Sequence, residues 1–145
     1  MKIKTGDMWS CLYMVDKFVV TTNAIIKRNG ALVMGAGIAK ECRDRFDGID
    51  IAIGTAIKRK GSEYGFLEGA HVCAFQVKHH FADNADLALI RKSTGMLRQF
   101  ALDNPRWKIA LNFPGIGNGR LAGMYEEILE IISVLPDNVT VWKFK

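Results

Sequence analysis

The sequence predicts an α/β protein built on a largely parallel central sheet. Segments typical of strands alternate with segments typical of helices from residue 17 to the end of the chain, which is the pattern of a parallel sheet with crossover helices. Two glycine-rich loops each follow a strand and precede a helix, and no linker divides the 145 residues. We therefore expect one domain, residues 1–145, which is long enough to bury a hydrophobic core.

The first half of the chain contains one expected strand and two expected helices. Residues 17–26, KFVVTTNAII, are β-branched and apolar, as in a strand, and a turn signal follows at 28–30. Apolar residues at helical spacing predict a helix that starts at or just after Gly37 and ends at 47–48. A second helix is expected over residues 49–59.

The second half continues the alternation. Residues 70–80, AHVCAFQVKHH, are typical of a buried strand, and apolar spacing predicts a helix over 87–101. Residues 107–120 read as a strand that runs into a glycine loop. The clearest amphipathic helix spans 124–135, with its glutamates facing water, and a last strand, VTVWKFK, follows at 139–145. Ligands in such folds bind at the carboxyl ends of the strands, so the loops after strands are the candidate functional segments.

The formal net charge of +5 favours anionic ligands such as nucleotides or nucleic acid. The cationic residues are scattered among KRNG at 27–30, KRK at 58–60 and the lysines around Trp142. They form no single basic stripe with interleaved aromatic residues. A solvated basic surface and a nucleic-acid-binding face both fit this pattern.

The three cysteines, Cys11, Cys42 and Cys73, are far apart and lack the spacing of a metal site, so we expect no metal and no cofactor. Small buried hydrophobic residues and a catalytic thiol are the two interpretations of these cysteines. The N-terminus, MKIKTGDMWS, has no apolar signal core, and no segment is long enough to span a membrane. We therefore expect a cytoplasmic protein with no membrane partner.

The two glycine loops are GAGIAK at 35–40 and PGIGNGRL at 114–121. Glycine lets backbone N–H groups come close to a phosphate, and a helix that starts behind the loop adds partial positive charge. Two such loops at the ends of separate strands can hold the two phosphates of one diphosphate. Tight turns without a ligand are the alternative. Neither loop has the GxxxxGK[ST] or GxGxxG pattern of the common nucleotide-binding motifs.

Four segments together resemble macro domains, the ADP-ribose-binding α/β modules, and they occur in the family's order. The resemblance implies a three-layer α/β/α fold with a mixed, largely parallel central sheet. Within the family, MGAGIA followed by a helix ending in Arg-Phe is most similar to the branch of terminal ADP-ribose glycohydrolases. That branch acts on ADP-ribosylated protein or DNA, and some relatives remove phosphate from ADP-ribose 1″-phosphate. The segments are TGDMW at 5–9, TTNAII at 21–26, MGAGIAKECRDRF at 34–46 and FPGIGNGRLAG at 113–123.

The resemblance implies ligand-binding roles. Asp7 matches a carboxylate that accepts a hydrogen bond from the adenine amino group, Met8 follows it in the same motif, and Phe144 falls where an apolar residue packs against adenine. A cap for Asp7 and ordinary packing for Phe144 are the alternatives. The residues that match the two phosphate loops are Gly35, Ala36, Gly37, Ile38, Ala39, Gly115, Ile116, Gly117, Asn118 and Gly119.

Asn23 matches the first Asn of the family's strand-end motif, which implies a role in ligand binding and catalysis. Ile26 occupies the place of the second Asn, which in the family holds the distal ribose. Asn29 is near enough in the sequence to substitute for it as a ligand-binding residue.

Three further positions bear on catalysis. Lys78 falls where the glycohydrolase branch has a nucleophilic lysine, although a solvated lysine is the alternative. The Asp that assists this lysine in the branch is missing, because Arg120 follows Gly119. His80 points to the same side as Lys78 if the strand continues that far, so it is a candidate general acid or base, or else a surface histidine.

Three functions therefore remain. The first is a hydrolase that releases ADP-ribose from modified protein or nucleic acid, or phosphate from ADP-ribose 1″-phosphate. The second is a non-catalytic reader or sequestering protein for ADP-ribose, which the missing Asp favours. The third is a basic nucleic-acid-binding module whose glycine loops contact backbone phosphates. ADP-ribose or an ADP-ribosylated macromolecule is thus the expected partner, and nucleic acid is a second partner that the basic surface suggests.

Overall fold

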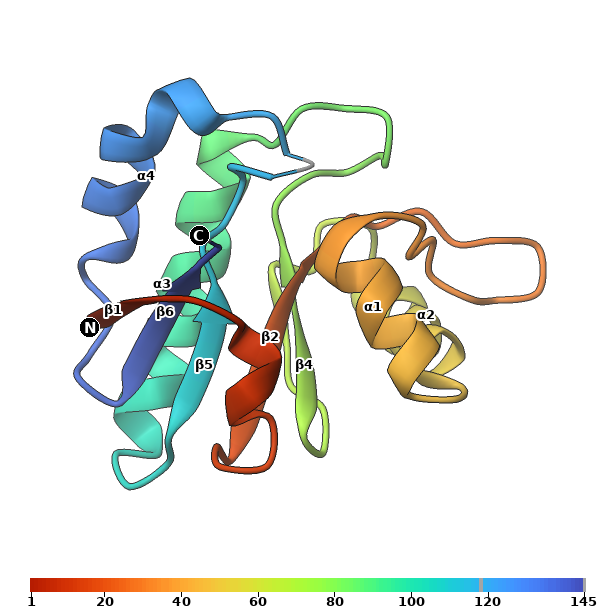
Figure 1. Cartoon of the computed structure of the whole chain (residues 1–145). Coiled ribbons are helices and arrows are strands. Elements are labelled where there is room, and N and C mark those ends of the chain that lie inside the picture. Colours follow the sequence, from red (N-terminus) through yellow and green to blue (C-terminus); the bar gives the residue numbers. More distant parts are fainter. Residues whose placement is uncertain (118, 145) are drawn as a thin grey trace.

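The computed structural model describes residues 1–117 and 119–144. Within these residues six strands form one sheet in the order β1-β6-β5-β2-β4-β3 (Figure 1). Neighbouring strands are parallel throughout, except that β3 pairs antiparallel with β4. The sheet is therefore mixed and largely parallel, as expected. The strands are β1 (Lys2–Thr5), β2 (Lys17–Thr22), β3 (Phe66–Leu67), β4 (Val72–Gln76), β5 (Ile109–Asn112) and β6 (Val139–Lys143).

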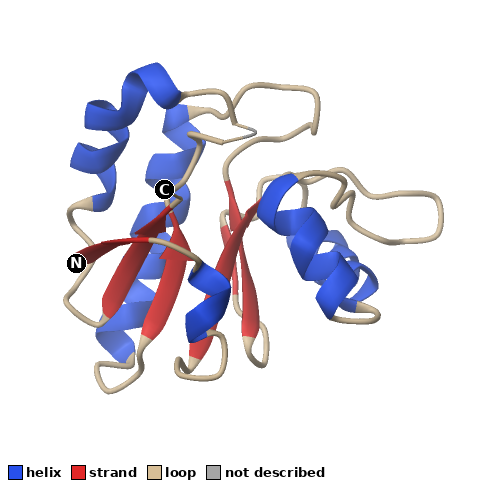
Figure 2. Cartoon of the chain, in the orientation of Figure 1, coloured by secondary structure: helices blue, strands red, loops and turns tan. Residues whose placement is uncertain are grey.

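Helices cover both faces of the sheet, which gives the three-layer α/β/α arrangement (Figure 2). Helices α3 and α4 pack on one face, while α1, α2 and the short 3-10 helix η1 pack on the other. No helix in the described part of the chain is long and apolar enough to cross a membrane. The helices are η1 (Met8–Cys11), α1 (Gly37–Arg45), α2 (Ile49–Lys60), α3 (Leu87–Asp103), the 3-10 helix η2 (Ala122–Met124) and α4 (Tyr125–Ile132).

The central strands build two cores because successive side chains point to opposite faces. In β2, Phe18 and Val20 join the core under α1 and α2, while Val19 joins the core under α3 and α4. In β4, Ala74 and Phe75 divide between the two cores in the same way. Buried on both faces, these strands read in the sequence as continuous apolar runs.

The predicted strands are shorter than expected, with the strand of 107–120 covering only Ile109–Asn112 and the last strand ending at Lys143, and two short strands were not predicted. The segment 17–26 is a strand only to Thr22, and the segment 70–80 only from Val72 to Gln76. β1 escaped prediction because its side chains are all exposed, so it shows no alternation of apolar and polar residues. β3 has only two residues, too few to produce a pattern.

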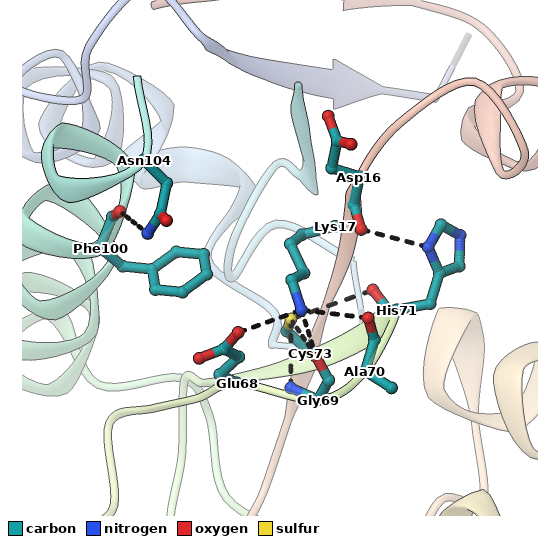
Figure 3. Close-up of polar contacts among 9 residues, drawn as sticks. All are labelled: Asp16, Lys17, Glu68, Gly69, Ala70, His71, Cys73, Phe100 and Asn104. Carbon is teal, nitrogen blue, oxygen red and sulfur yellow. Dashed lines mark hydrogen bonds and ion pairs between the residues drawn. The ribbon is translucent and has the colours of Figure 1, made fainter. Parts of the chain in front are cut away.

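Buried Lys17 fixes the amino end of the sheet (Figure 3). Its Nζ donates to the carbonyl oxygens of Gly69 and Ala70, at 2.7 and 3.0 Å, and pairs with the Glu68 carboxylate at 3.1 Å. The same ammonium lies 5.0 Å from the centre of the Trp107 ring. This cluster anchors the turn between β3 and β4, at the end of the sheet opposite to the carboxyl ends of the parallel strands.

Candidate functional site

A cleft of about 630 Å³ lies at the carboxyl ends of β2, β4, β5 and β6. The segments that follow these strands line it, namely the loop before α1, the loop before α3, the loop after β5 and the last residues of β6. The position agrees with the rule that ligands of open α/β sheets bind beyond the carboxyl ends of the strands. Both glycine loops take part in the lining.

The first glycine loop contributes all five of its predicted residues, 35–39, to the cleft. Gly37 has φ +59°, a left-handed conformation that favours glycine. A Cβ added at Gly35 would meet no atom within 4 Å, so the backbone there borders open space. No side chain of the described residues caps the start of α1, and the first N–H groups of a helix lack partners within it. The loop and helix start can therefore accept an anion.

The second glycine loop has glycines of two kinds. Gly115 has φ +83°, and a Cβ on Gly119 would lie 2.6 Å from the Gly115 oxygen, so the fold itself requires both glycines. A Cβ on Gly117 would meet no atom within 4 Å. Gly115, Ile116, Gly117 and Gly119 line the cleft, whereas Asn118 lies outside the described residues.

Asn23 lines the cleft and ties the end of β2 to the first glycine loop. Its Oδ1 accepts from the Ile25 N–H at 2.9 Å, and its Nδ2 donates to the Val33 carbonyl at 3.0 Å. Asn112, which was not predicted, also lines the cleft and is paired with Thr21 through both its Oδ1 and its Nδ2. Both amides hold backbone in place at the floor of the cleft.

Lys78 lies in the cleft wall and is only 9% exposed. Its Nζ donates to the carbonyl oxygens of Phe81 and Asp83, at 3.0 and 3.2 Å. Burial lowers the pKa of Lys78, and the nearby Arg120 guanidinium lowers it further, against an opposing effect of the Asp83 carboxylate. Lys78 is therefore easier to deprotonate than an ordinary lysine.

Lys78 and His80 both follow the end of β4 at Gln76, so strand alternation does not decide on which side His80 lies. Its Nδ1 accepts from the Ala82 N–H at 3.0 Å, and its ring lies 4.2 Å from that of Phe81. His80 is not among the described residues that line the cleft, whereas Phe81 is. The strand alternation that made it a candidate acid or base does not apply.

Arg120 occupies the position where the resembled branch has its assisting Asp. It lines the cleft, has φ +61°, and donates from Nη1 to the Ala82 carbonyl at 3.4 Å. It therefore links the second glycine loop to the loop that carries Lys78. Its position after the last glycine of PGIGNGRL was visible in the sequence, but its contact with residue 82 was not.

The opposite end of the cleft is formed by the last residues of β6 and adjoins η1. Phe144 lines the cleft and is 60% exposed, and Trp142 and Lys143 lie beside it. The Gly6 N–H donates to the Lys143 carbonyl at 2.8 Å, which places the TGDMW segment next to this end. Phe144 was predicted, whereas Trp142 and Lys143 were not.

Three predicted ligand-binding residues do not line the cleft. Asp7 caps η1, with its Oδ1 accepting from the Trp9 N–H at 3.0 Å, which is the alternative role expected for it. Met8 is 1% exposed and packs in the core under η1. Asn29 sits in an exposed turn, where its Oδ1 accepts from the Ala31 N–H, so the cleft lacks the side chain that was expected to replace the second asparagine.

Glu41 is the only aspartate or glutamate among the described residues that line the cleft. It lies on α1, one helical turn beyond Gly37, and its Oε2 accepts from the indole Nε1 of Trp9 at 2.7 Å. The sequence analysis missed it because a charged residue on an amphipathic helix resembles any solvated one. Its partner is 32 positions away in the chain.

Two of the cysteines, Cys42 and Cys73, are buried. Burial raises the pKa of the Cys42 thiol to about 12. Burial is also the main reason why the pKa of Cys73 is raised to about 11, so both thiols stay protonated at neutral pH. In residues 1–117 and 119–144, no group of three or more His, Cys, Asp or Glu side chains could hold a metal ion.

Comparison with solved structures identifies the fold. The chain is similar to DarTG of Thermosipho africanus, solved in complex with ADP-ribose, with a TM-score of 0.77 and 16% identity over 99% of this chain and 42% of that one. The macrodomain of Thermus aquaticus DarG gives a TM-score of 0.76 and 22% identity, over 99% of this chain and 97% of that one.

A third similar structure, the macrodomain of Mycobacterium tuberculosis DarG, gives a TM-score of 0.73 and 24% identity, over 98% of this chain and 95% of that one. No protein-family model and no curated protein matches the sequence. The identities are low, but the two DarG macrodomains align over nearly their whole length. The chain has the macrodomain fold.

Proposed function

We propose that this protein binds ADP-ribose in the cleft. The observation that carries the proposal is the pair of open glycines, Gly35 and Gly117, which line one cleft next to an uncapped helix start. Such backbone can hold the two phosphates of a diphosphate. The Thermosipho DarTG structure, which is similar in fold, was solved with ADP-ribose bound.

We infer the orientation of the ligand from the strand order. β6 and β4 are separated by β5 and β2, which puts their ends about 14 Å apart at the usual strand spacing. The diphosphate then lies over the middle of the cleft, where the two glycine loops follow β2 and β5. Phe144 and the Asp7 segment mark the adenosine end, and Lys78 marks the end for the distal ribose.

We further propose that the protein is a hydrolase in which Lys78 attacks C1″ of the distal ribose. The neutral amine forms a C–N bond to C1″ as the leaving group departs with the bonding electron pair, and the nitrogen gives up a proton to solvent. Water then adds at C1″ as the C–N bond breaks, which releases ADP-ribose and restores the lysine. Burial and Arg120 favour the neutral amine that this step needs. Arg120 also suits an anionic leaving group, such as the phosphate of ADP-ribose 1″-phosphate.

A non-catalytic reader is the second candidate. It is favoured by the two carbonyl oxygens that accept from Lys78 Nζ and by Arg120 in the place of a carboxylate. A cytoplasmic location and a nucleic-acid partner for the basic surface stay predictions from composition.

One assay separates the candidates. The protein is incubated with ADP-ribosylated protein, ADP-ribosylated DNA and ADP-ribose 1″-phosphate, and release of ADP-ribose or phosphate is measured for wild type and Lys78→Ala. Lysine-dependent release from any of the three supports the hydrolase. ADP-ribose binding without turnover of any substrate supports the reader.

A further inference from the structure

We propose that Glu41 is a specificity-determining residue that reads the exocyclic amino group of the base at the adenosine end of the cleft. The inference rests on the proposed binding of ADP-ribose and assigns a residue that neither the glycine loops nor the TGDMW motif supplies. It starts from the observation that Glu41 supplies the only carboxylate among the described residues that line the cleft, although the rest of this cleft suits anions.

The Glu41 carboxylate is held in place by Trp9. The indole Nε1 donates to Oε2 at 2.7 Å, a short distance for a bond from a neutral N–H. Trp9 is itself fixed, because its ring stacks on Phe18 at 4.7 Å and the Arg45 guanidinium lies 4.3 Å from it. One carboxylate oxygen is thus occupied by a rigid donor, and because Glu41 lines the cleft we infer that the other oxygen accepts from a ligand there.

Glu41 lies away from the expected diphosphate and distal ribose. It is four residues beyond Gly37 on α1, about 6 Å along the helix axis. Trp9 bonds to Glu41 through its indole and to Asp7 through its backbone N–H, so both carboxylates adjoin η1, and Gly6 just before η1 is bonded to Lys143 of β6. Lys78 is at the β4 end of the cleft. A carboxylate close to the diphosphate would repel the negatively charged phosphates.

An ionised carboxylate only accepts hydrogen bonds. The amino group of adenine donates, whereas the 6-oxo group of hypoxanthine accepts, so Glu41 stabilises the first and opposes the second. Because a site built for a donor leaves its own polar group unpaired against an acceptor, the cleft should distinguish the two bases. Glutamine at this position keeps an oxygen for Trp9 and adds an N–H that can donate to a 6-oxo group.

The test measures dissociation constants for ADP-ribose and for inosine diphosphate ribose, which differ only in the base. We expect wild type to prefer ADP-ribose by about tenfold, as for the loss of one hydrogen bond in a partly solvated site. Glu41→Gln should bring the two constants within about threefold of each other. Glu130→Gln, an exposed carboxylate on α4 outside the cleft, is the matched control and should keep the wild-type ratio.

Trp9→Phe tests the orienting bond. Phenylalanine keeps a ring for packing but loses Nε1, so the ratio of the two constants should fall even where overall stability falls as well. A wild-type ratio near one, or a ratio unchanged in Glu41→Gln, overturns the role of Glu41. A ratio lost in Asp7→Asn but kept in Glu41→Gln also overturns it, in favour of Asp7. Wild type that fails to bind ADP-ribose at all refutes the proposed function instead.

Discussion

Gly35 and Gly117 line the same cleft from two different loops, and a Cβ added to either would meet no atom within 4 Å. Neither has a positive φ, so a side chain at these positions leaves the backbone unstrained. Gly37, in contrast, has φ +59° and would strain the backbone as valine. The two open glycines therefore report on the ligand without disturbing the fold.

Gly35→Val and Gly117→Val should each weaken ADP-ribose binding by at least about tenfold, because the branched side chain takes the space of a phosphate. Circular dichroism should show both variants folded with melting temperatures close to wild type. Gly95→Val, on α3 and also without a neighbour within 4 Å of its Cβ, is the control outside the cleft. A folded Gly35→Val that binds ADP-ribose as wild type does would make this loop a structural turn.

Substitution should destabilise the fold at a glycine whose added Cβ would collide with its neighbours, and Gly54 is such a glycine. A Cβ on Gly54 of α2 would lie 2.1 Å from the Gly30 oxygen and 3.0 Å from the Leu32 nitrogen, so the helix can approach this backbone only as glycine. Gly54→Ala should cost about 2–3 kcal/mol of unfolding free energy, measured by urea denaturation. Gly95→Ala, in the open on α3, should stabilise by about 0.5–1 kcal/mol. Equal stability of the two variants would contradict the packing described for α2.

The sequence predicted the layers of the fold better than its edges. Apolar spacing identified α1, α3 and α4 because each buries one stripe, and the runs in β2 and β4 were visible because both faces of these strands are buried. β1 was missed because an exposed edge strand has no such pattern. Periodicity reports burial, so elements that bury little stay invisible to it.

The residues of the candidate site were also only partly predictable from the sequence. The glycine loops were recognisable because special backbone demands a special residue. The side of His80 could not be derived from strand alternation because β4 ends at Gln76, and Glu41 was missed because its partner Trp9 is remote in sequence. Side-chain contacts between distant segments follow from tertiary packing, which a local pattern does not encode.

The pH dependence of turnover should reveal the state of Lys78. Burial and Arg120 lower its pKa, and the amine must be neutral to attack. We therefore expect kcat/KM to rise with pH, with the midpoint of the rise below 10.5, the ordinary pKa of lysine. Arg120→Ala removes the neighbouring cation, so the midpoint of the rise should move to higher pH. A midpoint that stays in place in this variant would show that another group controls the profile.

Substitution of Lys78 decides between the hydrolase and the reader. Lys78→Ala should lower kcat at least about a hundredfold while ADP-ribose affinity changes little, because a nucleophile acts only beyond the ground state. The Lys78 ammonium also donates to the carbonyl oxygens of Phe81 and Asp83, so a loss of activity in Lys78→Ala has a second cause to be separated, the loosening of that loop. Lys78→Arg separates the two effects, since arginine keeps N–H donors but is not deprotonated in proteins. Lys60→Ala, an exposed lysine on α2 that does not line the cleft, is the control and should retain turnover.

The adduct between Lys78 and ADP-ribose provides the most direct measurement. With Arg120 where the resembled branch has an assisting Asp, no carboxylate of that loop helps water to release the sugar, so the second step should be slow. Intact-mass spectrometry shortly after mixing with substrate should then detect protein heavier by one ADP-ribosyl group, and the added mass should be absent from Lys78→Ala and Lys78→Arg. Full turnover by Lys78→Arg would exclude the lysine as nucleophile. Wild type that binds ADP-ribose yet processes none of the three substrates would establish the reader, with Lys78 a cation in the wall of the binding cleft.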